Sequence, residues 1–156
     1  MKGSGLHIAL YRPEIPPNTG NIARTCAATG TELHIVGTPG FRTTDRHLKR
    51  AGLDYWHSVK IAYHKDFAEL EKSLPLSRFI YFSSKAEILY TDFIYRENDC
   101  LVFGCETTGL PQHILDENFD RCVRIPIYKN IVRCLNLATS VGIALFEAIR
   151  QLGGLK

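Results

Sequence analysis

The sequence of 156 residues contains no hydrophobic run close to the ~20 residues that a bilayer-spanning helix needs. Its first five residues, MKGSG, lack the apolar segment and the cleavage site of a secretory signal peptide. We therefore expect these five residues to be flexible, and residues 1–156 to form a single domain located in the cytoplasm with no membrane partner.

Cysteine and histidine patterns that hold metals are also missing. The five cysteines are odd in number and include no C-x-x-C pair, so the sequence encodes neither a disulfide framework nor a zinc site of that type. The six histidines show no H-x-x-x-H or H-E-x-x-H spacing. We predict no metal. The formal net charge of +3 is compatible with an RNA partner but does not require one.

A glycine-rich turn is absent where dinucleotide-binding folds place it. Residues 6–11 are predicted to form the first strand, and the prolines of residues 12–17 then impose an extended loop. No G-x-G-x-x-G follows that strand, which disfavours a plain Rossmann enzyme.

The sequence does contain alternating strand-like and helix-like segments. This alternation predicts an α/β fold, a parallel sheet with helices on both faces. The predicted strands are residues 6–11, 32–37, 57–63, 78–84, 99–104 (the central strand) and 121–126. Helices are predicted at residues 18–29, capped by Asn18 and ended by Gly30, at 45–51, at 65–74 and from about Asn136 onward. Residues 85–98 are predicted to be loop with one short helical or strand-like turn.

Residues 101–111 (LVFGCETTGLP) begin as a buried-type strand and then break into two glycines with polar residues between them. Gly104 and Gly109 remove the Cβ where a ligand could approach the backbone, and Pro111 suits the first turn of a helix. Taken alone, the glycine pair fits a tight strand-to-helix turn at least as well as a binding site.

Two more stretches favour the binding site: residues 18–24 (NTGNIAR) and residues 124–141 (RIPIYKNIVRCLNLATSV). Together with FGCETTGLP they resemble the motifs of the SPOUT RNA 2′-O-methyltransferases, and most closely those of the small TrmL (YibK-like) tRNA enzymes. Residues 11–20 (YRPEIPPNTG), 50–55 (RAGLDY) and 147–153 (EAIRQLG) extend the resemblance over nearly the whole chain.

The resemblance implies a SPOUT fold with a C-terminal trefoil knot, S-adenosylmethionine as cofactor, and 2′-O-methylation of the wobble nucleotide, cytidine or uridine 34, in a tRNA anticodon loop. It implies a homodimer in which Arg24 of one chain serves the other chain's site. The catalytic residues that it implies are Arg24, Asn18, Glu106 and Asn136. The implied cofactor-binding residues are Phe82, Gly104, Gly109, Ile125 and Cys134.

The sequence departs from the family pattern at several positions, which bears on specificity and activity. Cys134 and Ala138 stand where relatives usually carry serine, Cys105 replaces proline or serine, Thr108 replaces a basic residue and Phe146 replaces tyrosine. A domain that binds RNA without catalysing transfer, methylation at another RNA site, and a flavodoxin-like cofactor binder therefore stay open as alternatives.

A basic segment supplies a candidate RNA-binding surface. Arg46, Lys49 and Arg50 are three and four residues apart, so a helix would place them on one face where they could neutralise phosphates together. A solvated helix face explains the same spacing nearly as well. Tyr55 and Trp56 adjoin this segment and fit either base stacking or core packing.

Overall fold

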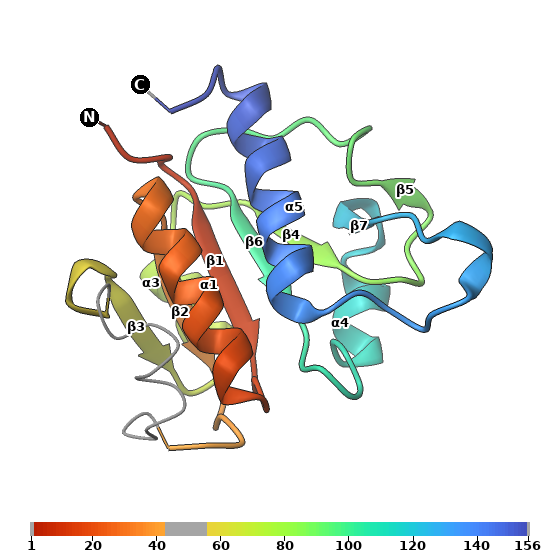
Figure 1. Cartoon of the computed structure of the whole chain (residues 1–156), viewed down its shortest axis with the longest axis horizontal. Coiled ribbons are helices and arrows are strands. Elements are labelled where there is room, and N and C mark those ends of the chain that lie inside the picture. Colours follow the sequence, from red (N-terminus) through yellow and green to blue (C-terminus); the bar gives the residue numbers. More distant parts are fainter. Residues whose placement is uncertain (1, 43–55, 156) are drawn as a thin grey trace.

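The computed structural model describes residues 2–42 and 56–155. The strands among these residues form one seven-stranded parallel sheet (Figure 1). Its strands follow the order β3-β2-β1-β6-β4-β7-β5. Their bounds are β1 His7–Tyr11, β2 Glu32–Val36, β3 Ile61–His64, β4 Phe79–Phe82, β5 Ile88–Leu89, β6 Cys100–Phe103 and β7 Cys122–Arg124. The predicted central strand is confirmed, since β6 is the fourth of the seven.

Helices cover both faces of this sheet. The α-helices are α1 Pro16–Thr29, α3 Phe67–Ser73, α4 Gln112–Glu117 and α5 Leu137–Gln151; the short 3-10 helices are Trp56–Ser58, Phe119–Arg121 and Tyr128–Asn130. In Figure 1, α1 and α5 lie side by side in front of β1 and β6. Ile22 of α1 and Leu145 of α5 pack in one core with Leu101, whereas Leu70 of α3 and Leu115 of α4 pack in a second core on the opposite face. The predicted fold class is therefore confirmed.

Alternation along the strands explains why one sequence can supply two cores. In β1, Ile8 and Leu10 point to the core under α1 and α5, and Ala9 between them points to the other core. All four residues of β6 are buried, because helices cover both sides of a parallel sheet. Among the described residues, no helix is long and apolar enough to cross a membrane.

Several predicted boundaries are corrected. The first helix begins at Pro16, with Ile15 as N-cap, so the prediction that Asn18 caps it is wrong. Proline at the first helical position needs no N–H partner and already has a helical φ, which moves the start upstream. Gly30 ends the helix as predicted, with φ 64° and its N–H bonded to the carbonyl of Cys26.

The predicted strand at residues 57–63 is instead a 3-10 turn followed by β3. The predicted loop at 85–98 contains the short edge strand β5, in agreement with the helical or strand-like turn expected there. The predicted helix at residues 45–51 lies outside the described residues. The trefoil knot stays a prediction.

Candidate functional site

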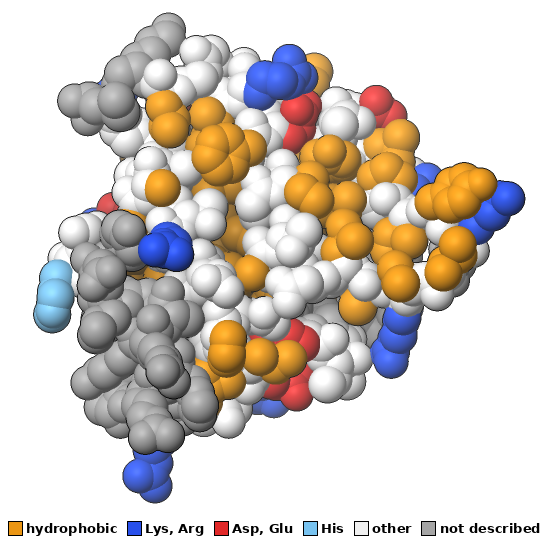
Figure 2. Space-filling view, in the orientation of Figure 1, with side chains coloured by type: hydrophobic (Ala, Val, Ile, Leu, Met, Phe, Trp, Pro, Cys, Tyr) orange, Lys and Arg blue, Asp and Glu red, His pale blue; other side chains and the backbone are white. Residues whose placement is uncertain are grey.

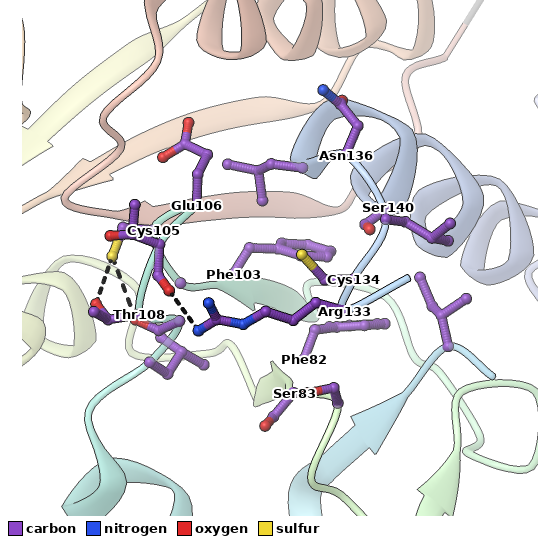
Figure 3. Close-up of a pocket in the computed structure, with 18 of the residues that line it drawn as sticks. Phe82, Ser83, Phe103, Cys105, Glu106, Thr108, Arg133, Cys134, Asn136 and Ser140 are labelled. Atoms are coloured by element: carbon purple, nitrogen blue, oxygen red, sulfur yellow. Dashed lines mark hydrogen bonds between the residues drawn. The ribbon is translucent and has the colours of Figure 1, made fainter. Parts of the chain in front are cut away.

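A pocket of about 530 Å³ lies at the carboxyl ends of β4 and β6 (Figure 3). Three loops line it: the segment after β4, the segment after β6 and residues 125–137 after β7. Its floor is aromatic, because the rings of Phe82 and Phe103 stack with centroids 4.6 Å apart. The five residues predicted to bind a cofactor all line this pocket, namely Phe82, Gly104, Gly109, Ile125 and Cys134. Their individual roles stay predictions.

The turn after β6 folds back onto Gly104. A Cβ on Gly104 would lie 2.1 Å from the carbonyl carbon of Gly109 and 2.3 Å from the nitrogen of Leu110. The N–H of Gly109 closes the turn on the carbonyl of Cys105 at 3.0 Å, and Gly109 has φ 70° with open space where its Cβ would be. The need for glycine at position 104 therefore comes from the turn's own backbone, as the alternative of a tight strand-to-helix turn predicts.

Glu106 connects this turn to the start of α1. Its Oε2 accepts the N–H of Glu14 at 2.8 Å, and its Oε1 accepts the N–H of Ile15 at 3.1 Å and Nδ2 of Asn18 at 3.3 Å. A carboxylate at a helix N-terminus satisfies free N–H groups and interacts favourably with the helix dipole. These contacts favour a role for Glu106 in holding the loop over a role in touching substrate.

Glu14 makes the reciprocal contact. Its Oε1 accepts the hydroxyl of Thr107 at 2.7 Å and the N–H of Thr107 at 3.2 Å. The hydroxyl bond from Thr107, followed by a hydrogen bond from Cys105, lowers the pKa of the Glu14 carboxyl. Glu106 and Glu14 thus join the turn after β6 to the start of α1, because each carboxylate accepts hydrogen bonds from the other segment.

Asn18 and Asn136 extend this connection to α5. Nδ2 of Asn136 donates to Oδ1 of Asn18 at 2.9 Å, and Oδ1 of Asn136 accepts the N–H of Thr139 at 3.2 Å as the N-cap of α5. The helix predicted to begin near Asn136 is confirmed. Three of the four predicted catalytic residues, Glu106, Asn18 and Asn136, therefore form one hydrogen-bonded chain at the pocket wall.

Arg24 is not brought to this pocket. It lies on the exposed side of α1, and the pocket lining within the same chain does not include it. Pro17, Asn21 and Ala28 are exposed on the same helix at helical spacing from it. Arg46, Lys49 and Arg50, the predicted RNA-binding residues, lie outside the described residues.

Arg133 lines the pocket and was not predicted. Its Nη2 donates to the carbonyl of Thr107 at 3.1 Å, and Figure 3 shows its side chain reaching across the pocket toward the turn after β6. Its position in the third motif, three residues before Asn136, was the available signal. Its bond to a carbonyl in another loop could not be inferred from spacing.

A pocket at the carboxyl edge of a parallel sheet, near the point where the strand order reverses between β1 and β6, is characteristic of α/β proteins that bind a nucleotide or a related ligand there. The chain belongs to the SpoU rRNA Methylase family, whose model matches residues 5–146.

Similar proteins and solved structures are consistent with membership of this family. The chain is 47% identical over 149 residues to a Bacillus subtilis (strain 168) protein named "Putative tRNA (cytidine(34)-2'-O)-methyltransferase", covering 94% of this chain and 92% of that protein. A solved structure described as "Structural insights into the 2-OH methylation of C/U34 on tRNA" superposes with a TM-score of 0.89 at 46% identity, covering 95% and 96% of the two chains. An AdoMet-bound rRNA methyltransferase from Sinorhizobium meliloti superposes with a TM-score of 0.84 at 26% identity, covering 97% of this chain and 58% of that one.

Proposed function

We propose that this protein transfers a methyl group from S-adenosylmethionine to the ribose 2′-oxygen of the wobble nucleotide, cytidine or uridine 34, in tRNA. One observation carries the proposal: the loops after β4, β6 and β7 converge on a single pocket in a chain 47% identical to a protein named for that reaction. The alternative of a flavodoxin-like binder loses its support with the family membership.

The pocket fits the cofactor in size and character. A volume of about 530 Å³ falls in the range of 300–1,000 Å³ typical of cofactor sites. Phe82, Phe103 and Ile125 offer an apolar wall for an adenine ring, and the loop backbones offer donors and acceptors at its edge. S-adenosylmethionine supplies a methyl group bonded to a positively charged sulfur. The chain's own task is to hold the reactants in line, which contributes roughly 7–11 kcal/mol to such a reaction.

Arg24 of a partner subunit completes the site in this proposal. Its exposure on α1, away from the pocket of its own chain, suits a role across a dimer interface. Figure 2 shows hydrophobic side chains on the face that α1 and α5 cover, and Phe146 of α5 is 51% exposed. These exposed apolar side chains support a homodimer built on this face.

A charged Arg24 stabilises the oxygen as its proton leaves. Removing a proton from the guanidinium group of an arginine at neutral pH is costly, so Arg24 acts as a cation and not as a base. Stabilising the developing negative charge by a positioned cation needs no such cost.

The transfer assay follows radiolabelled methyl from the cofactor into bulk tRNA, with the modified nucleotide mapped by mass spectrometry. Label on the 2′-oxygen of nucleotide 34 is the expected result. Label at another nucleotide would contradict the wobble assignment, and cofactor binding without transfer would favour a binding domain that has lost activity.

Complementation tests the shared site. Cys134→Trp should fill the pocket from an exposed loop position, whereas Val132→Trp, an exposed position outside the pocket lining, is the control. Neither Arg24→Ala nor Cys134→Trp homodimers should be active, but mixed dimers should recover part of the activity. Verified mixed dimers with no recovery would show that each site uses its own Arg24.

Arg46, Lys49 and Arg50 are proposed to hold phosphates that flank the nucleotide. Replacing all three by alanine should weaken tRNA binding and flatten its salt dependence by up to about three phosphate contacts, with cofactor affinity unchanged. Unaltered tRNA binding across the salt range would reject this surface. A cytoplasmic location and catalysis without metal stay predictions, and methyl transfer in the presence of a chelator tests the second.

A further inference from the structure

Three histidines and a glutamate meet on the sheet face that α3 covers, away from the pocket. His7 begins β1, His34 lies in the middle of β2 and His64 ends β3, so the three run diagonally across neighbouring strands. Glu32 is opposite His7 in the register of β1 and β2. His7 and Glu32 both start their strands, which places them at the amino edge of the sheet, whereas the pocket lies at the carboxyl edge.

Three ligand atoms in this cluster form a triangle small enough for one ion to contact all three. Nδ1 of His7 is 3.1 Å from Nε2 of His34 and 3.5 Å from Oε2 of Glu32, and the last two atoms are 3.9 Å apart. The centre of the circle through these three atoms lies about 2.05 Å from each of them. Zinc binds histidine nitrogen at about 2.0–2.1 Å and carboxylate oxygen at about 2.0–2.2 Å.

The outer contacts of the cluster suit ligands around an ion. Nδ1 of His34 is 2.9 Å from Nε2 of His64, so the ring can donate its second N–H while Nε2 keeps a lone pair. The other oxygen of Glu32, Oε1, accepts Nζ of Lys60 at 2.7 Å. The His34 side chain is 4% exposed and that of Glu32 is 33% exposed, so the cluster is anchored in the core and open to solvent on one side.

We propose that His7, Glu32 and His34 form a site for a borderline divalent transition-metal ion such as Zn²⁺, with water in the fourth position. Two imidazoles and one carboxylate select Zn²⁺ or its neighbours over Mg²⁺ and Ca²⁺, which prefer oxygen ligands. An ion there would tie β1 to β2 at the amino edge. Chain spacing predicted no metal, because ligands brought together by neighbouring strands have no fixed separation along the sequence.

The competing arrangement is a ladder of hydrogen bonds in which His34 bonds to His7 through Nε2 and to His64 through Nδ1, with donor and acceptor set by the ring tautomers. An ion needs a lone pair on both Nδ1 of His7 and Nε2 of His34, whereas the ladder needs a proton between these two atoms. Binding of an ion therefore distinguishes them.

Calorimetric titration of chelator-treated full-length protein with Zn²⁺ is the first measurement, and the visible spectrum with Co²⁺ is the second. We expect one ion per chain, a four-coordinate Co²⁺ spectrum and a higher unfolding temperature with Zn²⁺ but not with Mg²⁺. His7→Ala and Glu32→Gln, at partly exposed positions, should each weaken Zn²⁺ binding at least ten-fold. His57→Ala and His113→Ala, at exposed positions elsewhere, should not.

Failure of wild-type protein to bind Zn²⁺, or equal affinity in His7→Ala and Glu32→Gln, would overturn the site and leave the ladder. His64 is assigned a positioning role: His64→Leu should weaken Zn²⁺ binding by about 10–100-fold, and His64→Gln, which keeps an acceptor, should restore part of it. Equal Zn²⁺ affinity in His64→Leu and wild type would remove that role.

Discussion

The two edges of the sheet are built in different ways. At the carboxyl edge, main-chain turns surround a pocket, and polar side chains mostly bind backbone groups of other loops, as Glu106 does with the N–H groups of Glu14 and Ile15. At the amino edge, His7, Glu32 and His34 project from regular strands and approach one another directly. The carboxyl edge therefore depends on loop conformation, whereas the amino edge depends on side-chain identity.

The sharpest test of this difference adds a single methyl group to the turn after β6. Gly104→Ala should lower the free energy of unfolding by about 3 kcal/mol or more and abolish cofactor binding, because its Cβ would lie 2.1 Å from backbone. Gly109→Ala is the matched control, since its Cβ has open space and only φ 70° is unfavourable, at about 1 kcal/mol. Urea unfolding and calorimetry measure both. Similar losses in the two variants would contradict the assigned role of Gly104.

Removing the Glu106 carboxylate should have the next largest effect. Glu106→Ala leaves the N–H groups of Glu14 and Ile15 without this acceptor, and we expect a loss of about 2 kcal/mol together with weaker cofactor binding. Glu106→Gln retains one oxygen acceptor and should lose less. If Glu106→Ala kept full stability and lost only methyl transfer, Glu106 would have to act on substrate.

Substitutions of Asn136 distinguish its role as N-cap of α5 from its hydrogen bond to Asn18 of α1. Asn136→Ala should cost about 1 kcal/mol through the lost N-cap. Asn136→Asp keeps an acceptor for the N–H of Thr139 but cannot donate to Asn18, so its stability should stay close to that of the wild type while cofactor affinity falls. Unfolding curves and cofactor titrations of the two variants provide the comparison. Unchanged cofactor affinity in Asn136→Asp would show that the link is dispensable.

The smallest expected effect is a pH dependence at Glu14. Its pKa is lowered in the folded protein, so its stabilising contribution is complete above the ordinary value of 4.5 and is lost as the pH falls through the lowered pKa. Glu14→Gln should reduce the acid-range slope of stability against pH, measured by urea unfolding at a series of pH values. An identical slope in this variant would rule out the contribution.

Local patterns explain which parts of this structure are predictable from sequence. The apolar residues Val141, Ala144, Leu145 and Ala148 recur at helical spacing, and all four are buried in α5. Gly30 likewise ends α1 through its own conformational freedom. By contrast, the start of α1 is stabilised by Glu106, more than 90 positions away in the chain, which no local pattern contains.

The pocket was predictable only as a set of motifs. The five residues that the resemblance names as cofactor-binding all line one cavity, namely Phe82, Gly104, Gly109, Ile125 and Cys134. The resemblance did not reveal that Gly104 is required by the turn itself, because that contact depends on how residues 104–110 fold back.

The position of β1 has a consequence for synthesis of the chain. β1 pairs with β2 on one side and with β6 on the other, where His7 is opposite Cys100. At about 5–20 residues per second, a ribosome takes roughly 5–20 s to proceed from the first of these residues to the second. During that interval one edge of β1 has no strand to pair with, and such long-range parallel pairing is slow to form. The nascent protein therefore passes through a state that exposes an apolar strand edge, in which chaperones or premature association compete with folding.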